Sequence, residues 1–290
     1  MFNKLNFGMR GHDTKATDIE SLAKILEEAG AAHVQLALKK SFKDINWQNS
    51  ILTPELGCYI KNTLAEHGVR VSVLGCYINP VHPDEAKRKE EVEWFKAHLK
   101  FAKYLGCDMV GTETGFYNTF EETHTEENYQ RFFKSMREIV DCAENLGSIV
   151  GVETVTKHSM FNPKMTKRFL DEIDSPNVTI IYDPVNISDM NDRDEQHKIV
   201  DEVYGLYGDR IGILHFKDYE VIDGRKEGRL AGDGVFDYEY LFKYAKKYTP
   251  VINAILETNS EDNFKNTAEK ILSIWAVSYT HLTLPTNSRV

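Results

Sequence analysis

Short runs of mostly apolar residues alternate along this chain with longer stretches whose apolar residues repeat at a helical period. Continuous apolar runs are typical of parallel strands that are buried on both faces. The 3.6-residue period is typical of helices that cover such a sheet with one face. The pattern predicts eight strands, at residues 5–9, 33–38, 70–75, 109–113, 149–153, 178–183, 211–215 and 252–257.

A helix is expected after each of these strands. The clearest begins near Pro83 and ends at Gly106, with an apolar stripe that includes Phe95 and Leu99. Strands that alternate with amphipathic helices predict a parallel sheet. Eight such units fit a single-domain α/β fold of the closed (β/α)8 TIM barrel type. The alternative is a doubly wound open sheet, which needs a phosphate-binding glycine turn after the first strand, and Gly8-Met-Arg-Gly11 is not one.

The barrel is predicted to span residues 1–275, with the last helix ending at Trp275. Residues 276–290 are rich in Thr and Ser and contain Pro285 and a single charged residue, Arg289. This composition is that of a sequencing or cloning read-through, so we expect a non-native tail outside the barrel.

Composition narrows the class of protein. The net charge of −10 argues against a nucleic-acid partner, although it does not exclude a local basic patch. The four cysteines show no CxxC spacing, which is typical of reduced thiols. No signal-peptide pattern is present and no apolar run approaches the roughly 18 residues of a membrane span. We therefore expect a cytoplasmic protein without a membrane partner, and leave a homo-oligomer open.

Four predicted strands end on a side chain that binds metals: Glu153, Asp183, His215 and Glu257. They are separated by 30, 32 and 42 residues, and a strand–helix–strand unit takes roughly 30 or more. The four groups therefore lie at the same end of their strands. In barrel enzymes the chemistry takes place at that end.

Two glutamates that end apolar runs need a compensating cation, because burying an unpaired carboxylate costs several kcal/mol. A salt bridge is the alternative, but neither run contains Lys or Arg. Carboxylate oxygens with one imidazole suit one divalent ion of Mn, Mg, Co or Zn, and the sequence does not choose among them. Such an ion polarises a carbonyl and stabilises an enediolate. With Glu153 and Glu257 as the acid/base pair, proton transfer would give epimerisation or isomerisation.

Several short motifs carry a resemblance to a known family: Gly151-Val-Glu153, Tyr182-Asp-Pro-Val-Asn186, His215-Phe-Lys-Asp218, Gly232-Asp-Gly-Val-Phe-Asp237 and Leu256-Glu257. In this order and spacing, the chain resembles the xylose isomerase-like TIM-barrel superfamily over roughly residues 5–275, in the branch of sugar phosphate isomerases/epimerases, ketose 3-epimerases and inosose enzymes. The resemblance implies that Glu153, Asp183, His215 and Glu257 bind one divalent metal. It also implies that Glu153 and Glu257 act as acid and base on a small sugar or sugar phosphate.

One position departs from the pattern of many ketose epimerases, which have a substrate-binding His where this chain has Asn186. The departure leaves metal binding intact but weakens any transfer of ketose specificity. The substrate-binding residues expected from positions near strand ends are His12, Glu113, His158, Asn186, Lys217 and Asp218. A loop rich in glycine and charge is expected over residues 223–234. Its residues Arg225, Lys226 and Arg229 are better explained as solvated than as a phosphate site.

Three other functions are alternatives for this sequence. A lyase of the inosose dehydratase type would use the same site, with one Glu assisting the departure of hydroxide. An abasic-site endonuclease on this fold needs a three-zinc cluster, more histidines and a basic face. A non-catalytic sugar-binding barrel would not require both Glu153 and Glu257. The sequence does not fix the substrate, the metal or the oligomeric state.

Overall fold

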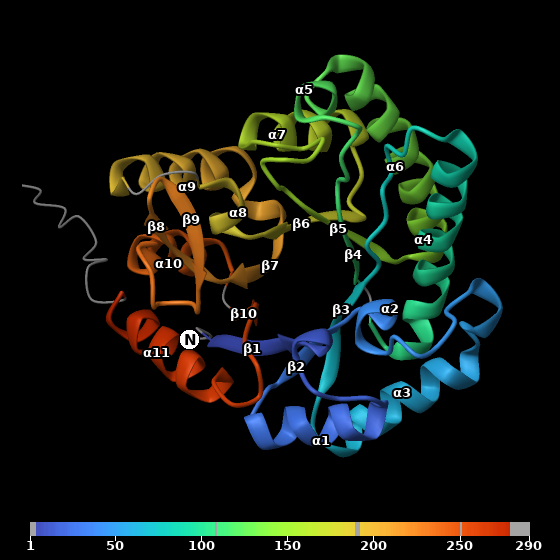
Figure 1. Cartoon of the computed structure of the whole chain (residues 1–290), viewed down its shortest axis with the longest axis horizontal. Coiled ribbons are helices and arrows are strands. Elements are labelled where there is room, and N and C mark those ends of the chain that lie inside the picture. The colour runs from blue at the N-terminus through green and yellow to red at the C-terminus, as the bar shows by residue number, and fades with distance from the viewer. Residues whose placement is uncertain (1–3, 108, 189–191, 250, 279–290) are drawn as a thin grey trace, which may run out of the picture.

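A computed structural model describes residues 4–107, 109–188, 192–249 and 251–278. Eight parallel strands close into a barrel in the spatial order β1-β10-β7-β6-β5-β4-β3-β2, which confirms the predicted (β/α)8 architecture (Figure 1). Their bounds are β1 (Lys4–Arg10), β2 (His33–Leu36), β3 (Arg70–Gly75), β4 (Met109–Glu113), β5 (Ile149–Glu153), β6 (Val178–Tyr182), β7 (Ile211–Phe216) and β10 (Val251–Leu256).

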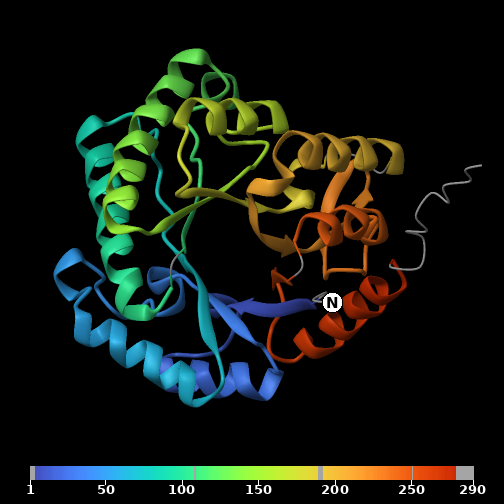
Figure 2. The ribbon, with the colours of Figure 1, turned by 180° about the vertical axis from the view of Figure 1, so that it is seen from behind.

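The long helices form an outer ring around the strands, which Figures 1 and 2 show from the two ends of the barrel. They are α1 (Ile19–Ala29), α3 (Pro54–Glu66), α4 (Glu85–Leu105), α6 (Glu126–Leu146), α7 (Pro163–Ile173), α9 (Arg193–Tyr207), α10 (Tyr238–Tyr248) and α11 (Phe264–Val277). Short helical segments join them: α2 (Leu38–Ser41), α5 (Phe120–Thr123), α8 (Pro184–Ile187) and the 3-10 turns η1 (Gly11–Asp13), η2 (Asn49–Ile51) and η3 (Gly208–Arg210).

Local signals set the helix ends. Thr53 and Asn162 cap α3 and α7 with their side chains, and in each case a proline occupies the first helical position, where its missing N–H costs nothing. Gly106 ends α4 with φ of 65°, a left-handed backbone that glycine adopts without a Cβ clash. The last helix runs to Val277, two residues beyond the predicted end at Trp275. Residues 279–290 lie outside the described part, so the proposed read-through stays a prediction.

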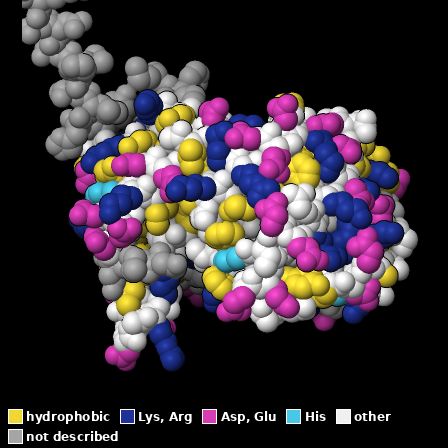
Figure 3. Space-filling view, turned by 90° about the horizontal axis from the view of Figure 1, so that it is seen from above, with side chains coloured by type: hydrophobic (Ala, Val, Ile, Leu, Met, Phe, Trp, Pro, Cys, Tyr) yellow, Lys and Arg dark blue, Asp and Glu magenta, His cyan; other side chains and the backbone are white. Residues whose placement is uncertain are grey.

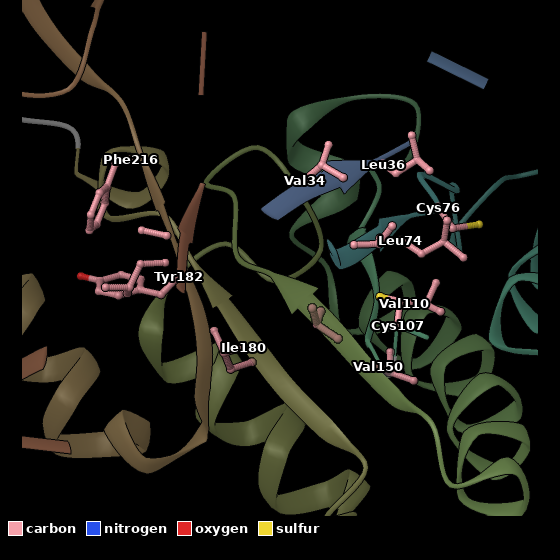
Figure 4. Packing of buried hydrophobic residues seen from close by; sticks show 14 of the residues in the cluster. Val34, Leu36, Leu74, Cys76, Cys107, Val110, Val150, Ile180, Tyr182 and Phe216 are labelled. Carbon is pink, nitrogen blue, oxygen red and sulfur yellow. The ribbon is translucent and has the colours of Figure 1, made fainter. Parts of the chain in front are cut away.

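The core has two layers. Between strands and helices lie outward-facing side chains such as Val34, Leu74, Val110 and Ile180 (Figure 4). A second cluster, Val73, Ile181, Ile213 and Ile255, is packed with Met109. Because strand side chains alternate with period two, the residues two positions after Ile181, Ile213 and Ile255 share their inward face. Those residues are Asp183, His215 and Glu257, so the apolar cluster forms the floor beneath the site.

One region differs from its prediction. The charged stretch after His215, expected to be a loop over 223–234, contains an antiparallel hairpin of β8 (Asp218–Ile222) and β9 (Arg225–Arg229). Its two-residue turn is Asp223-Gly224, with φ of 50° and 74°, the positive values that a tight hairpin requires. The apolar alternation that marks most strands is missing because β9 is largely exposed. The hairpin stands at the rim beside β7 and α8 (Figure 1).

The surface carries charges of both signs. In Figure 3, lysine and arginine side chains are interspersed with aspartate and glutamate over the face shown. Among the described residues, no helix combines the length and apolar character needed to cross a membrane.

Candidate metal centre

Three of the four predicted ligands converge at the C-terminal end of the barrel. Glu153 on β5, His215 on β7 and Glu257 just after β10 each offer one ligand atom, and these atoms lie within 4.8 Å of one another. His215 Nδ1 is 3.1 Å from Glu257 Oε1 and 3.7 Å from Glu153 Oε2. All three residues are buried, so their charges interact in a region with little water to screen them.

The chemistry of this group fits a divalent cation. Two carboxylates and one imidazole are a donor set used for Mn, Co, Zn and related ions. His215 is fully buried, and its Nε2 has no hydrogen-bond partner among the described residues. Buried polar atoms without partners are costly, and a metal ion is one way to satisfy them.

Asp183 lies beside this group of three. Its Oδ1 caps α8 by accepting the backbone N–H groups of Val185 and Asn186, at 2.8 Å and 3.1 Å. Its Oδ2 lies 2.6 Å from Lys217 Nζ, which is also 2.9 Å from Glu257 Oε2. The Lys217 ammonium therefore links Asp183 to Glu257. The role of Asp183 as a fourth ligand stays a prediction.

The two glutamates have different neighbours. Glu257 pairs with two cations from other segments, because Arg10 Nη1 on β1 lies 3.1 Å from its Oε1 and Lys217, just after β7, contacts its Oε2. Glu153 Oε1 accepts a hydrogen bond of 2.6 Å from the Asn186 amide. Within the described residues, the ion-pair partner of Glu153 is His215 alone. The salt-bridge alternative considered from the sequence therefore holds for Glu257, through side chains that lie outside its own strand.

Burial and charge shift the pKa values of the site. Burial lowers the pKa of His215, but the negative charges and hydrogen bonds of Glu153 and Glu257 outweigh it and raise the pKa to about 10. Burial raises the pKa of Asp183 to about 6, against the opposing effect of the Lys217 ammonium. Burial also raises the pKa of Glu257, yet His215 and Lys217 hold it well below its usual range. Arg10, Lys217 and protonated His215 thus face the carboxylates of Glu153, Asp183 and Glu257, and a metal ion bound by His215 would take the place of its proton.

The predicted substrate-binding residues take different positions. Glu113 and His158 come together, with His158 Nδ1 3.6 Å from Glu113 Oε2. His12 lies edge-on to the Tyr77 ring, with the ring centroids 6.4 Å apart. Asn186 and Lys217 contact the carboxylates described above. These residues therefore surround the metal centre, and their binding of a substrate remains a prediction.

Asp218 organises the backbone that follows β7 through hydrogen bonds to its carboxylate. Its carboxylate accepts backbone N–H groups of Tyr219, Gly232 and Phe236, at 2.8 Å, 3.1 Å and 3.0 Å. It thus ties the start of β8 to the segment that follows β9. Of the cationic loop residues, Arg229 pairs with Glu220, which agrees with a solvated charged surface. Lys226 differs from that expectation, because its ammonium donates hydrogen bonds to the carbonyl oxygens of Val185 and Ser188.

Sequence reasoning did not single out Arg10, Gln35 or Tyr77, which also face the barrel mouth. Gln35 is the lone amide in an otherwise mostly apolar strand, and Tyr77 continues the inward alternation of Val73 and Gly75. Gln35 Nε2 donates a hydrogen bond of 2.6 Å to the Tyr77 hydroxyl. Gln35, a polar residue within a buried strand, was the sequence feature from which the Gln35–Tyr77 pair could have been predicted.

Residues 19–275 match the family model described as xylose isomerase-like TIM barrel. The chain belongs to this family. It is 27% identical, over 57% of its length, to the Escherichia coli protein named "Putative L-ribulose-5-phosphate 3-epimerase", of which it spans about half, 56%. In fold it is similar to the zinc-bound IOLI protein, with a TM-score of 0.73, 16% identity and coverage of 95% of this chain and 99% of that one. It is also similar to a D-tagatose 3-epimerase-like protein, with a TM-score of 0.72, 18% identity and coverage of 94% and 98%.

Proposed function

We propose that this protein is a divalent-metal-dependent isomerase or epimerase of a sugar or sugar phosphate. The proposal rests mainly on the buried group of Glu153, His215 and Glu257. This group can bind a metal ion, and its two carboxylates come from different parts of the barrel and can also transfer protons. Membership of the xylose isomerase-like family and the likeness to named epimerases support the substrate class. The name of the E. coli relative makes L-ribulose 5-phosphate a natural first substrate to test.

The proposed chemistry assigns the proton transfers to the two glutamates. Glu153, His215 and Glu257, with Asp183 beside them, would hold the cation, which supplies Lewis acidity toward a carbonyl oxygen. One glutamate removes the proton on the carbon next to the carbonyl, and the electron pair of that C–H bond becomes the new C–C double bond of an enediolate. The other glutamate returns a proton to the opposite face. The substrate then regains its carbonyl with inverted configuration.

The test is solvent deuterium exchange. The protein, loaded in turn with Mn²⁺, Mg²⁺, Co²⁺ or Zn²⁺, is incubated in D2O with L-ribulose 5-phosphate, D-tagatose or an inosose, and deuterium next to the carbonyl is followed by NMR. The wild type should exchange this position and form an epimer or isomer. Glu153→Gln and Glu257→Gln should each slow product formation about 10²- to 10⁴-fold, the usual contribution of a general acid or base.

The two variants should also differ in a specific way. If each glutamate serves one face of the substrate, the glutamate that remains in each variant still exchanges the proton of the epimer on its own side with solvent. That epimer is not converted to the other one. The two variants should therefore exchange different epimers. Glu66→Gln is the matched control, because Glu66 is exposed at the end of α3. The proposal would be refuted if no substrate exchanged deuterium next to its carbonyl with any of the metals. A product that has lost water would point to the dehydratase alternative.

A further inference from the structure

The mouth of the barrel is divided into two halves of different chemistry. The strands β5, β6, β7 and β10 contribute the metal centre and Lys217. The strands β1 to β3 contribute Arg10, Gln35 and, just beyond β3, Tyr77. Arg10 joins the halves, because it is paired with Gln35 in the strand register and reaches Glu257 at 3.1 Å. The second half has no part in the proton transfers proposed above.

Gln35 is the main feature of this second half. Its side chain is 2% exposed, and its Oε1 accepts no hydrogen bond from any described residue. A buried amide oxygen without a hydrogen-bond donor destabilises the folded protein by roughly 1–3 kcal/mol, which argues against a purely structural role for Gln35. Its Nε2 is already committed to Tyr77. The free oxygen is therefore an acceptor that a ligand hydroxyl can satisfy.

Tyr77 supplies the complementary donor. Its hydroxyl oxygen accepts the Gln35 amide N–H at 2.6 Å, which leaves the phenol proton free to donate. The negative charges of Glu153 and Glu257 both act on this phenol, so it lies within electrostatic reach of the metal centre. His12 packs edge-on to the same ring, and its buried Nδ1 also lacks a hydrogen-bond partner among the described residues.

We propose that Gln35 and Tyr77 form a specificity subsite that binds hydroxyl groups of an open-chain sugar, on the side of the mouth opposite the metal ligands. The proposal deepens the proposed function and rests on it for the identity of the ligand. Gln35 Oε1 accepts from one hydroxyl of the sugar chain, and the Tyr77 hydroxyl donates to the same or the adjacent oxygen. The pair selects the configuration of carbons that do not react, because a misplaced hydroxyl leaves the buried acceptor unpaired.

Gln35→Leu and Tyr77→Phe test the subsite, since each removes polar atoms at nearly constant volume. Binding of L-ribulose 5-phosphate and D-tagatose to the metal-loaded protein is measured by calorimetry, and KM and kcat are measured wherever turnover occurs. Each variant should raise Kd and KM about tenfold, the effect of one lost hydrogen bond to a buried partner, and leave kcat within about threefold. The double variant should cost less than the two single effects combined, because both act on one hydrogen-bonded unit.

Tyr104→Phe and Gln130→Leu, which alter exposed side chains of the same types, are matched controls and should leave Kd unchanged. Metal affinity, measured separately by calorimetry, should be the same in all variants. The subsite proposal would be wrong if Gln35→Leu and Tyr77→Phe both bound the sugars as tightly as the wild type, or if they lowered only kcat. It would also be wrong if the wild type bound neither sugar. Binding without proton exchange, lost in the same two variants, would support the subsite and refute the proposed function instead.

Discussion

Lys217 Nζ lies 2.6 Å from Asp183 Oδ2, in a position where it also reaches Glu257. A flexible ammonium thus neutralises two carboxylates that are themselves almost fully buried. Removing one partner of a buried ion pair costs about 3–5 kcal/mol, because the other charge is left without compensation.

Lys217→Met should therefore destabilise the metal-free protein by about 3 kcal/mol. The loss should be smaller with metal bound, because a cation replaces part of the missing charge. Thermal unfolding with EDTA and with excess Mn²⁺ measures both values. Lys15→Met is the control, since Lys15 pairs with Asp262 at the exposed surface and such pairs contribute about 0–1 kcal/mol. Equal losses with and without metal would contradict this account of Lys217.

His215→Gln should abolish the stabilisation that metals give. A ligand present at 100 times its Kd stabilises a folded protein by about 2.7 kcal/mol, and the melting temperature rises accordingly. The wild type should show such a rise with at least one of Mn²⁺, Mg²⁺, Co²⁺ and Zn²⁺, and chelation should reverse it. His197→Gln should retain it, because His197 pairs with Asp237 on the outer helices. A rise that persists in His215→Gln would place the metal elsewhere.

His98 should make stability depend on pH below neutrality. Burial lowers the pKa of His98 to about 4, whereas the unfolded chain has a value near 6.5. The unfolded state therefore binds the extra proton first, so stability is complete above about pH 6.5 and falls as the pH drops toward 4. Between pH 7 and pH 5 this one group should cost about 2 kcal/mol. His98→Gln should flatten the profile in that window, and an unchanged slope would show that other groups dominate it.

Asp218→Ala should loosen the hairpin more than the barrel. The carboxylate accepts one backbone N–H group in β8 and two after β9, and the loss of each such charge-assisted hydrogen bond costs about 1.5–3 kcal/mol. Hydrogen exchange over residues 219–236 should become faster, while exchange in β4 and β5 stays slow. Asp233→Ala, which removes only an exposed pair with Lys270, is the control. Uniform acceleration across the barrel would instead indicate a general loss of stability.

Lys40→Met should lower kcat/KM for phosphorylated sugars but not for unphosphorylated ones. Lys40 lies on α2 within electrostatic reach of Glu113, and its ammonium lies over the Tyr77 ring, 3.5 Å from the centroid. Lys40 and Tyr77 also line a cavity of about 160 Å³. A phosphate at that end of the substrate would gain a charged hydrogen bond, so kcat/KM for L-ribulose 5-phosphate should fall about tenfold or more. The value for D-tagatose should not change, and Lys43→Met, an exposed neighbour, should affect neither sugar.

The sequence predicted the barrel well because its strands are buried on both faces. The strands at 70–75, 109–113 and 149–153 have the expected bounds, since continuous apolar runs admit few other interpretations. The exposed strand β9 was missed because its residues carry no apolar alternation. Local turn chemistry, the Asp223-Gly224 pair, was the stronger signal there.

The site could be predicted only in part, for a physical reason. Strand-end position identifies Glu153, His215 and Glu257, because barrel closure brings those ends together. It does not reveal that Lys217 lies between Asp183 and Glu257, or that Arg10 reaches across from β1. Such pairings depend on side-chain reach across the barrel, which spacing along the chain does not encode.

The hairpin has an indirect connection to the chemistry. Lys226, near its tip, donates hydrogen bonds to the carbonyl oxygens of Val185 and Ser188, and Asn186 between them holds Glu153. The hairpin thereby steadies the short helix α8, whose Asn186 amide orients the Glu153 carboxylate. Substitutions in this hairpin should therefore shift the position of the Glu153 carboxylate without altering any residue of the barrel strands.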